Sequence, residues 1–169
     1  KKQGKSLKGS QNFGVIPECH ATKHLNREGF PIGALIAKKE IANLMVPGTH
    51  GSTLGFLLNS YGPALAVIEM IEKEGLLKNV KKMGKYLRGK IENLKKKYSF
   101  IKEIRGLGLM LGVELKIPCE KIVENCLKKG LLINCTQKKI LRIMPPIIVT
   151  EKEIDKAINI LDKVMEKEK

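Results

Sequence analysis

The segment IKEIRGLGLMLGVEL, residues 101–115, contains two apolar runs that decide the fold of the C-terminal half. Ile101 to Ile104 and Leu107 to Leu115 are joined through Arg105-Gly106. The second run is too apolar and too rich in glycine for a helix, and branched apolar residues are typical of strands. The segment therefore predicts two short strands of a small sheet.

Helices flank this segment on both sides. Between Lys78 and Tyr98, apolar residues recur at three- and four-residue steps, which predicts one helix with a single apolar stripe. Thr150 and Glu153 form the pattern of a capping box in front of the last helix. The two stripes contain Val80, Met83, Leu87, Ile91 and Leu94 in the first helix and Ile154, Ala157, Ile158, Leu161 and Met165 in the last.

The other predicted elements of this half are short. Pro118 opens a helix that runs through Lys129, where Gly130 ends it. Strands are predicted at Leu131 to Asn134 and at Ile140 to Ile143. This mixture of strands and helices from residue 99 onward predicts fold class α/β to α+β, with helices laid on one face of a small sheet.

The N-terminal part is less regular. Residues 1–29 carry no sustained apolar period and are interrupted by glycine and proline, which indicates loop or a damaged edge segment. Pro31 to Ala37 is compatible with a strand, and Lys39 to Val46 with two helical turns. Pro63 is suited to the first turn of a helix, and the apolar residues Ala64 to Ile71 follow it.

Length and composition predict a globular chain. The 169 residues are 43% hydrophobic and 29% charged, and a chain of this length removes about 70% of its unfolded surface from water. No apolar run approaches the roughly 18 residues of a membrane span, so we expect no membrane association. The N-terminal residues are basic and polar without the apolar core of a secretory signal, so we expect the chain in the cytoplasm.

The net charge of +15 is the most conspicuous feature of the composition. Much of it lies between Lys78 and Lys97, where nine basic residues face the single acid Glu92. Nucleic-acid binding is one interpretation, because basic faces release counterions from phosphates. Lysine outnumbers arginine there, however, and aromatic residues for base stacking make up only 4% of the chain, with no Trp. A solvated helix face is the interpretation that we favour.

Four cysteines are present, and no Cys-x-x-Cys pair occurs among them. A chain with this much apolar material needs no disulfides, so we expect Cys19, Cys119, Cys126 and Cys135 to be reduced. Cys126 falls on the apolar face of its predicted helix and is expected to be a buried thiol. Cys19 and His20 lack further ligands at suitable spacing, so the sequence predicts no metal site.

Four segments carry a more specific signal when taken in order. They are Gly29-Phe30-Pro31-Ile32-Gly33-Ala34, Gly48-Thr49-His50-Gly51-Ser52-Thr53, Arg105-Gly106-Leu107-Gly108-Leu109-Met110-Leu111-Gly112, and Gly130-Leu131-Leu132-Ile133-Asn134 with Leu141-Arg142 and Pro145-Pro146. From about Gln11 to its end, the chain resembles the C-terminal part of class III pyridoxal-phosphate-dependent aminotransferases, most of all the acetylornithine branch.

The resemblance implies the C-terminal portion of the aspartate-aminotransferase-like fold, fold type I of the pyridoxal-phosphate enzymes, in an obligate homodimer. On this basis residues 1–59 are a loop-rich remnant of the large cofactor-binding domain. Residues 60–98 are connecting helices, and residues 99–169 form the small C-terminal α+β domain. Enzymes of this family are more than twice this length, so we expect a fragment or truncated copy that lacks much of the cofactor site.

The resemblance also implies a reaction and its cofactor. In this family pyridoxal 5'-phosphate takes the amino group of a small-molecule amino donor, here N-acetylornithine, and passes it to 2-oxoglutarate in arginine biosynthesis. Lys23 is the candidate for the lysine that binds the cofactor as a Schiff base. Counting back from Gly29 without a gap places His24 at that position, so Lys23 requires a shift of one residue.

Three further site residues follow from the resemblance. Thr53, assisted by Ser52, matches the hydroxyl that contacts the cofactor phosphate of the neighbouring subunit. Arg142 matches the arginine that binds the substrate carboxylate, and a guanidinium suits that role because it offers two parallel donors and stays charged.

Two alternatives remain open at this stage. The chain could be a catalytically inactive remnant, folded by its own core after residue 60, that dimerises or pairs with a full-length paralogue. A basic nucleic-acid-binding protein is the less favoured second alternative.

Overall fold

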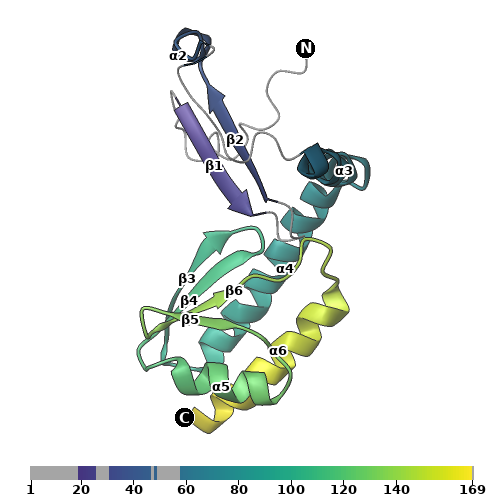
Figure 1. Cartoon of the computed structure of the whole chain (residues 1–169). Coiled ribbons are helices and arrows are strands. Elements are labelled where there is room, and N and C mark those ends of the chain that lie inside the picture. Colours follow the sequence, from purple (N-terminus) through teal and green to yellow (C-terminus); the bar gives the residue numbers. More distant parts are fainter. Residues whose placement is uncertain (1–18, 26–30, 47, 49–57, 169) are drawn as a thin grey trace. The chain divides into compact units, whose positions relative to one another are not determined.

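A computed structural model describes residues 19–25, 31–46, 48 and 58–168 of the chain (Figure 1). The chain divides into two compact units, Lys1–Glu69 and Met70–Lys169. The helix α4, Leu76–Lys97, which we expected to be a connector, thus falls within the second unit. Whether residues 1–59 derive from a large cofactor domain stays a prediction.

The described part of the first unit contains an antiparallel pair of strands. The strand β1, Cys19–Leu25, pairs with β2, Pro31–Ala37, from Cys19 opposite Ala37 to Leu25 opposite Pro31. The strand predicted at residues 31–37 is confirmed. Of the two interpretations of residues 1–29, loop is wrong for Cys19–Leu25, whereas an edge segment agrees with β1 of this two-stranded sheet. In β1 the alternation of Cys19, Ala21 and Leu25 is broken by Lys23, so its own pattern is weak and the strand is defined by its pairing with the apolar β2, the next strand along the chain.

Two helices follow in the chain. The helix α2, Lys39–Ala42, is shorter than the two turns predicted over residues 39–46. The helix α3, Leu58–Lys73, begins before the predicted start, so Pro63 lies inside it rather than at its first turn. Neither of these helices, nor any other described helix, is long and apolar enough to cross a membrane.

The second unit is a four-stranded antiparallel sheet with helices on one face, which confirms the predicted α+β arrangement (Figure 1). The strands lie in the order β3-β4-β6-β5. After α4 its elements are β3 (Ile101–Leu107), β4 (Met110–Leu115), α5 (Glu120–Lys128), β5 (Asn134–Thr136), β6 (Ile140–Ile143), α6 (Glu151–Met165) and the 3-10 turn η1 (Glu166–Glu168).

One face of the sheet forms the core. Ile104, Val113 and Leu141 lie in one cross-strand row and are buried beneath the helices. The predicted stripes pack against this face, with Val80 and Ala157 only partly buried. Their buried members are Met83, Leu87, Ile91 and Leu94 of α4 and Ile154, Ile158, Leu161 and Met165 of α6.

The turn between β3 and β4 lies directly against α4. Leu107 pairs with Met110, so Gly108 and Leu109 form the turn, and Gly108 has a positive φ of 56° that favours glycine there. Our expectation of a break at Arg105-Gly106 is wrong, because β3 continues to Leu107.

A Cβ added at Gly84 of α4 would lie 2.5 Å from the backbone carbon and oxygen of Gly108, so this contact requires a helix position without a side chain.

Many lysines of α4 lie on its solvent side, and three of them pair with acids of α6. Nζ–carboxylate distances are 2.9 Å for Lys82–Glu151, 2.7 Å for Lys90–Asp155 and 2.9 Å for Lys97–Asp162. Residue numbers rise together along both helices, so α4 and α6 run in the same direction. These lysines therefore connect two helices, whereas we expected the whole basic face to be merely solvated.

Tyrosine hydroxyls strengthen the same helix pair. Tyr86 donates to Asp155 over 2.9 Å, and the buried Tyr98 donates to Asp162 over 2.6 Å. Asp155 has its pKa lowered by hydrogen bonds from Lys90 and Tyr86. The predicted capping box of α6 is present, since Thr150 accepts from the amide of Glu153 and the Glu153 carboxylate accepts from the amide of Thr150.

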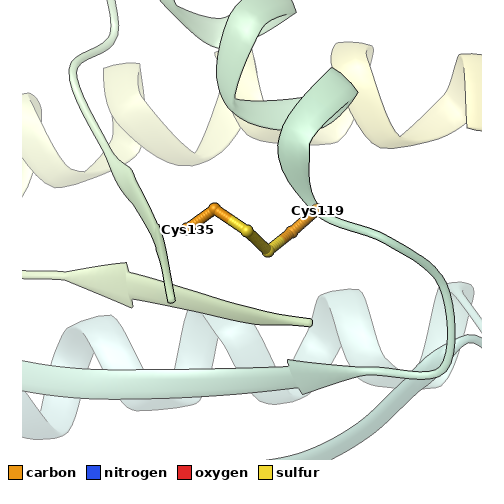
Figure 2. The surroundings of a disulfide bond; sticks show 2 residues. All are labelled: Cys119 and Cys135. Atoms are coloured by element: carbon orange, nitrogen blue, oxygen red, sulfur yellow. A yellow bond between two sulfur atoms is a disulfide. The ribbon is translucent and has the colours of Figure 1, made fainter. Parts of the chain in front are cut away.

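The cysteines correct another expectation. Cys119 and Cys135 form a disulfide, with their Cα atoms 5.8 Å apart, so the prediction that they are reduced is wrong (Figure 2). The two cysteines are 16 residues apart in the sequence, with Cys119 at the start of α5 and Cys135 in β5. The strand β5 covers Asn134–Thr136 rather than the predicted Leu131 to Asn134. Cys126 is a buried free thiol as predicted.

Replacing Gly84 with Ala should destabilise the chain by about 1–3 kcal/mol, because the new methyl group would overlap the backbone of Gly108. Gly89→Ala is the matched control on the same helix, since nothing lies within 4 Å of its added Cβ and the residue is exposed. It should gain up to about 1 kcal/mol from helix propensity. Chemical denaturation measures both, and equal effects of the two substitutions would refute the close approach.

Candidate functional site

Arg142 lies on the open face of the four-stranded sheet. In β6 it is paired with Gly112 of β4 on one side and with Asn134 of β5 on the other. Its chain neighbour Leu141 is fully buried on the helix-covered face, and adjacent strand residues point to opposite faces. Arg142 is therefore exposed on the face that none of the described helices of this unit covers.

A second guanidinium lies on the other side of Gly112. Arg105 of β3 pairs with Gly112 in the register, and its Nη1 donates to Glu114 over 2.6 Å and to Glu103 over 3.0 Å. Lys102 also donates to Glu114, over 2.7 Å. Hydrogen bonds from Lys102 and Arg105 lower the pKa of Glu114, which keeps this carboxylate charged. The charge of Arg105 is thus matched by acids of its own sheet.

Arg142 has a different environment. Within the described ranges it has no acidic partner, and its Nε donates to the Met144 sulfur over 3.0 Å. This contact uses Nε, the donor on the side of the guanidinium. The terminal nitrogens then remain for an end-on pair of hydrogen bonds, the geometry in which arginine binds a carboxylate.

Lys23 lies in the middle of β1. Its register partner on β2 is Gly33, so its cross-strand neighbour has no side chain. His24 is paired with Ile32. The two candidate positions therefore have different cross-strand neighbours, a glycine for Lys23 and an isoleucine for His24.

The remaining predicted site residues divide as follows. Ser52 and Thr53 lie outside the described residues. Lys23 belongs to the first unit and Arg142 to the second, and each is described within its own unit. In the part of the chain that the structure describes, no group of three or more His, Cys, Asp or Glu gathers into a metal site.

Sequence reasoning missed two features of the arginine face. Met144 was not singled out, although residues two apart on or beside a strand share a face, and that spacing from Arg142 was a usable signal. The engagement of Arg105 by Glu114 had no such signal, because it depends on how β3 and β4 pair.

The chain matches the family Aminotransferase class-III over residues 7–165. It is 44% identical over 160 residues to the acetylornithine aminotransferase of Caldanaerobacter subterraneus subsp. tengcongensis, covering 94% of this chain and 40% of that protein. It is 46% identical over 156 residues to the acetylornithine aminotransferase of Methanocaldococcus jannaschii, covering 91% of this chain and 39% of that protein. The chain thus spans about 40% of the length of these relatives.

Solved structures show the same relationship. The acetylornithine aminotransferase from Elizabethkingia anophelis superposes with a TM-score of 0.83 at 26% identity, covering 94% of this chain and 43% of that one. The ornithine aminotransferase from Toxoplasma gondii gives a TM-score of 0.84 at 27% identity, covering 95% of this chain and 40% of that one. The expected fold, a portion of fold type I of the pyridoxal-phosphate enzymes, is confirmed.

Class-III aminotransferases depend on pyridoxal 5'-phosphate. A lysine amine is the group that binds the aldehyde of this cofactor. Lys23 meets this requirement in residue type, and its backbone lies in β1 opposite Gly33. The described candidates are therefore compatible with the cofactor.

Replacing Glu114 with Gln should lower the melting temperature at neutral pH, because Lys102 and Arg105 lose a charged partner. The folded pKa of Glu114 is below its ordinary value, so this stabilisation is present above the unfolded pKa and is lost as pH falls through the folded pKa. The difference from wild type should therefore shrink once the pH falls below about 4.3. Thermal melts from pH 7 to pH 3 measure it.

Glu120→Gln is the control for this titration, because no ion pair of Glu120 occurs among the described residues. It should give a smaller change at pH 7. A Glu114→Gln deficit that stays constant down to pH 3 would contradict the assigned ion pairs.

Proposed function

Because the chain belongs to the family of class-III aminotransferases, we propose that it serves pyridoxal-phosphate-dependent transamination of N-acetylornithine with 2-oxoglutarate. The relatives that share 44% and 46% of its aligned residues are named acetylornithine aminotransferases, which supports this amino donor over others. The structural observation that carries the proposal is Arg142, an exposed guanidinium with no acidic partner among the described residues and with its terminal nitrogens available.

Arg142 binds the carboxylate of the amino donor and then that of 2-oxoglutarate. An end-on pair of hydrogen bonds fixes the plane of the carboxylate and so orients the rest of the substrate. The Met144 sulfur restrains the guanidinium by accepting from Nε. Arg105 does not compete for the substrate, because Glu103 and Glu114 already accept its hydrogen bonds.

Lys23 would hold the cofactor through Nζ, and as a free amine it would accept and return the substrate proton with the same atom. Pyridoxal 5'-phosphate, when bound, supplies an electron-withdrawing ring that makes the substrate Cα–H acidic. Thr53 and Ser52 would donate hydrogen bonds to the phosphate of the cofactor in the neighbouring subunit, as in the family pattern. A contact from a neighbouring subunit requires two chains, so we propose that the working protein is a homodimer. We also propose that it acts in arginine biosynthesis in the cytoplasm.

A second candidate function is a folded interaction module without catalysis. The observation that favours it is the core of residues 70–169, which closes around side chains of α4, α5, α6 and the sheet. A unit with such a core has the means to fold and to pair with another aminotransferase chain whether or not this chain binds cofactor.

The role of Lys23 predicts a covalent adduct. Borohydride treatment of the purified chain with pyridoxal 5'-phosphate should attach the cofactor to the peptide that contains Lys23, as read by mass spectrometry. Lys23→Ala should abolish that adduct, and His24→Ala should retain it because a Schiff base requires a primary amine, which histidine lacks. An adduct that survives Lys23→Ala disproves the assignment, and a folded chain with no adduct favours the interaction module.

The role of Arg142 predicts a binding defect. Arg142→Gln should weaken 2-oxoglutarate binding by about 10- to 100-fold, since charge-assisted bonds contribute roughly 1.5–3 kcal/mol. Arg142→Lys should recover part of the affinity, because an ammonium retains the charge but not the paired donors. Isothermal titration of the full chain measures both.

Arg105→Gln is the matched control on the same sheet face, and it should leave 2-oxoglutarate affinity unchanged. A loss of affinity as large as that of Arg142→Gln would show that the carboxylate is not held by Arg142 in particular.

A further inference from the structure

The disulfide of the second unit joins two elements that are otherwise weakly connected. Cys119, fully buried, stands at the N-terminal end of α5, and Cys135 lies in β5 (Figure 2). Their Cα separation of 5.8 Å falls within the usual range for a disulfide. The bond closes a segment of the chain that includes all of α5.

The strand that the disulfide holds is a weak one. β5 has three residues, lies at the edge of the sheet and pairs with β6 alone. Short edge strands open more readily than central strands, since their backbone bonds reach one neighbour and water. The covalent link to Cys119 is therefore a large part of what keeps β5 in place.

The turn after β5 also depends on outside support. Gln137 and Lys138 both have positive φ, 50° and 61°, in a conformation that glycine and asparagine favour. Two backbone bonds anchor this turn, from the Cys119 amide to the Lys138 carbonyl over 2.9 Å and from the Leu115 amide to the Lys139 carbonyl over 2.7 Å. Since Cys119 supplies both the disulfide and one of these bonds, the anchor and the crosslink act at one point.

We propose that Cys119–Cys135 is a reversible redox modification site that clamps the β5–β6 hairpin to α5. The reacting agents are small thiols and disulfides of the glutathione class. One thiolate attacks the sulfur of Cys135, the less buried partner, and forms a mixed disulfide while the Cys119 sulfur leaves. A second thiol then releases Cys135, so two thiols become one disulfide, two electrons pass to the protein and both cysteines end protonated.

The third cysteine of this unit does not interfere with the exchange. Cys126 is fully buried in α5, and burial raises the pKa of its thiol to about 11. It is therefore a protonated thiol at neutral pH and a poor nucleophile toward the neighbouring disulfide. Exchange is thus confined to Cys119 and Cys135 within this unit.

The clamp concerns the folding of residues 70–169 and stands apart from the proposed transamination. One consequence does rest on that function: β6 carries Arg142 opposite Asn134, the residue directly before Cys135 in β5. Opening the clamp would loosen the strand beside the carboxylate-binding arginine.

The test compares melting temperatures of the full chain with and without reductant. Reduction should lower the melting temperature of the wild type by roughly 10 °C or more, because the bond joins residues 16 apart in a unit that runs from Met70 to Lys169. Cys119→Ala and Cys135→Ala should melt near the reduced wild type and should not respond to reductant. Cys126→Ala, the matched control, should keep the full response.

Reversibility is measured by incubating the chain in glutathione buffers of graded reduced-to-oxidised ratio and mapping the linked peptides by mass spectrometry. We expect both states to be populated across the series, with faster amide exchange in β5 when the bond is open. A bond that persists in fully reduced glutathione would overturn the proposal, as would four free thiols in oxidised glutathione or a melting temperature that ignores reductant.

Discussion

The close contact between Gly84 of α4 and the backbone of Gly108 is the constraint on which the second unit depends. With no side chain at either position, the helix lies directly on the turn that joins the first two strands of the sheet. That contact places the apolar stripe of α4 on the buried sheet face and leaves the lysines of α4 on the sides of the helix that face away from the sheet. Lys90 and Lys97 then reach acids of α6, so one backbone approach fixes both the core and the helix pair.

One face of the sheet is buried beneath helices, and the other carries Arg142 and Arg105 exposed. Leu141 is fully buried, and because the side chains of a strand alternate, its neighbour Arg142 must emerge on the open face. Burial of Leu141 therefore decides the face of the sheet on which Arg142 lies. On the open face, neutralisation of Arg105 by Glu114 leaves Arg142 as the arginine of that row without an acidic partner among the described residues.

Local patterns predicted the elements that carry their own signal. The stripe from Met83 to Leu94 predicted α4, and the capping box at Thr150 predicted the start of α6. Each of these signals is local, because it comes from residues that are neighbours on a single helix. β1 carries only a broken pattern, so the sequence left it between loop and edge segment, and the pairing with β2 decides. Lys23 and Arg142 were chosen as candidates because the chain resembles a family in four ordered motifs, and such a resemblance does not show which strand face Arg142 occupies.

By itself, the sequence determined the family, the helices α4 and α6 and most strands of the second unit, and it supplied candidate residues for a substrate carboxylate and a cofactor aldehyde. Only the tertiary structure decided which cations are neutralised and which cysteines meet. The physical reason is that periodicity and capping act over one or two turns of chain. Ion pairs such as Lys97–Asp162 and the bond between Cys119 and Cys135 depend instead on how distant elements pack and on the register in which their strands pair.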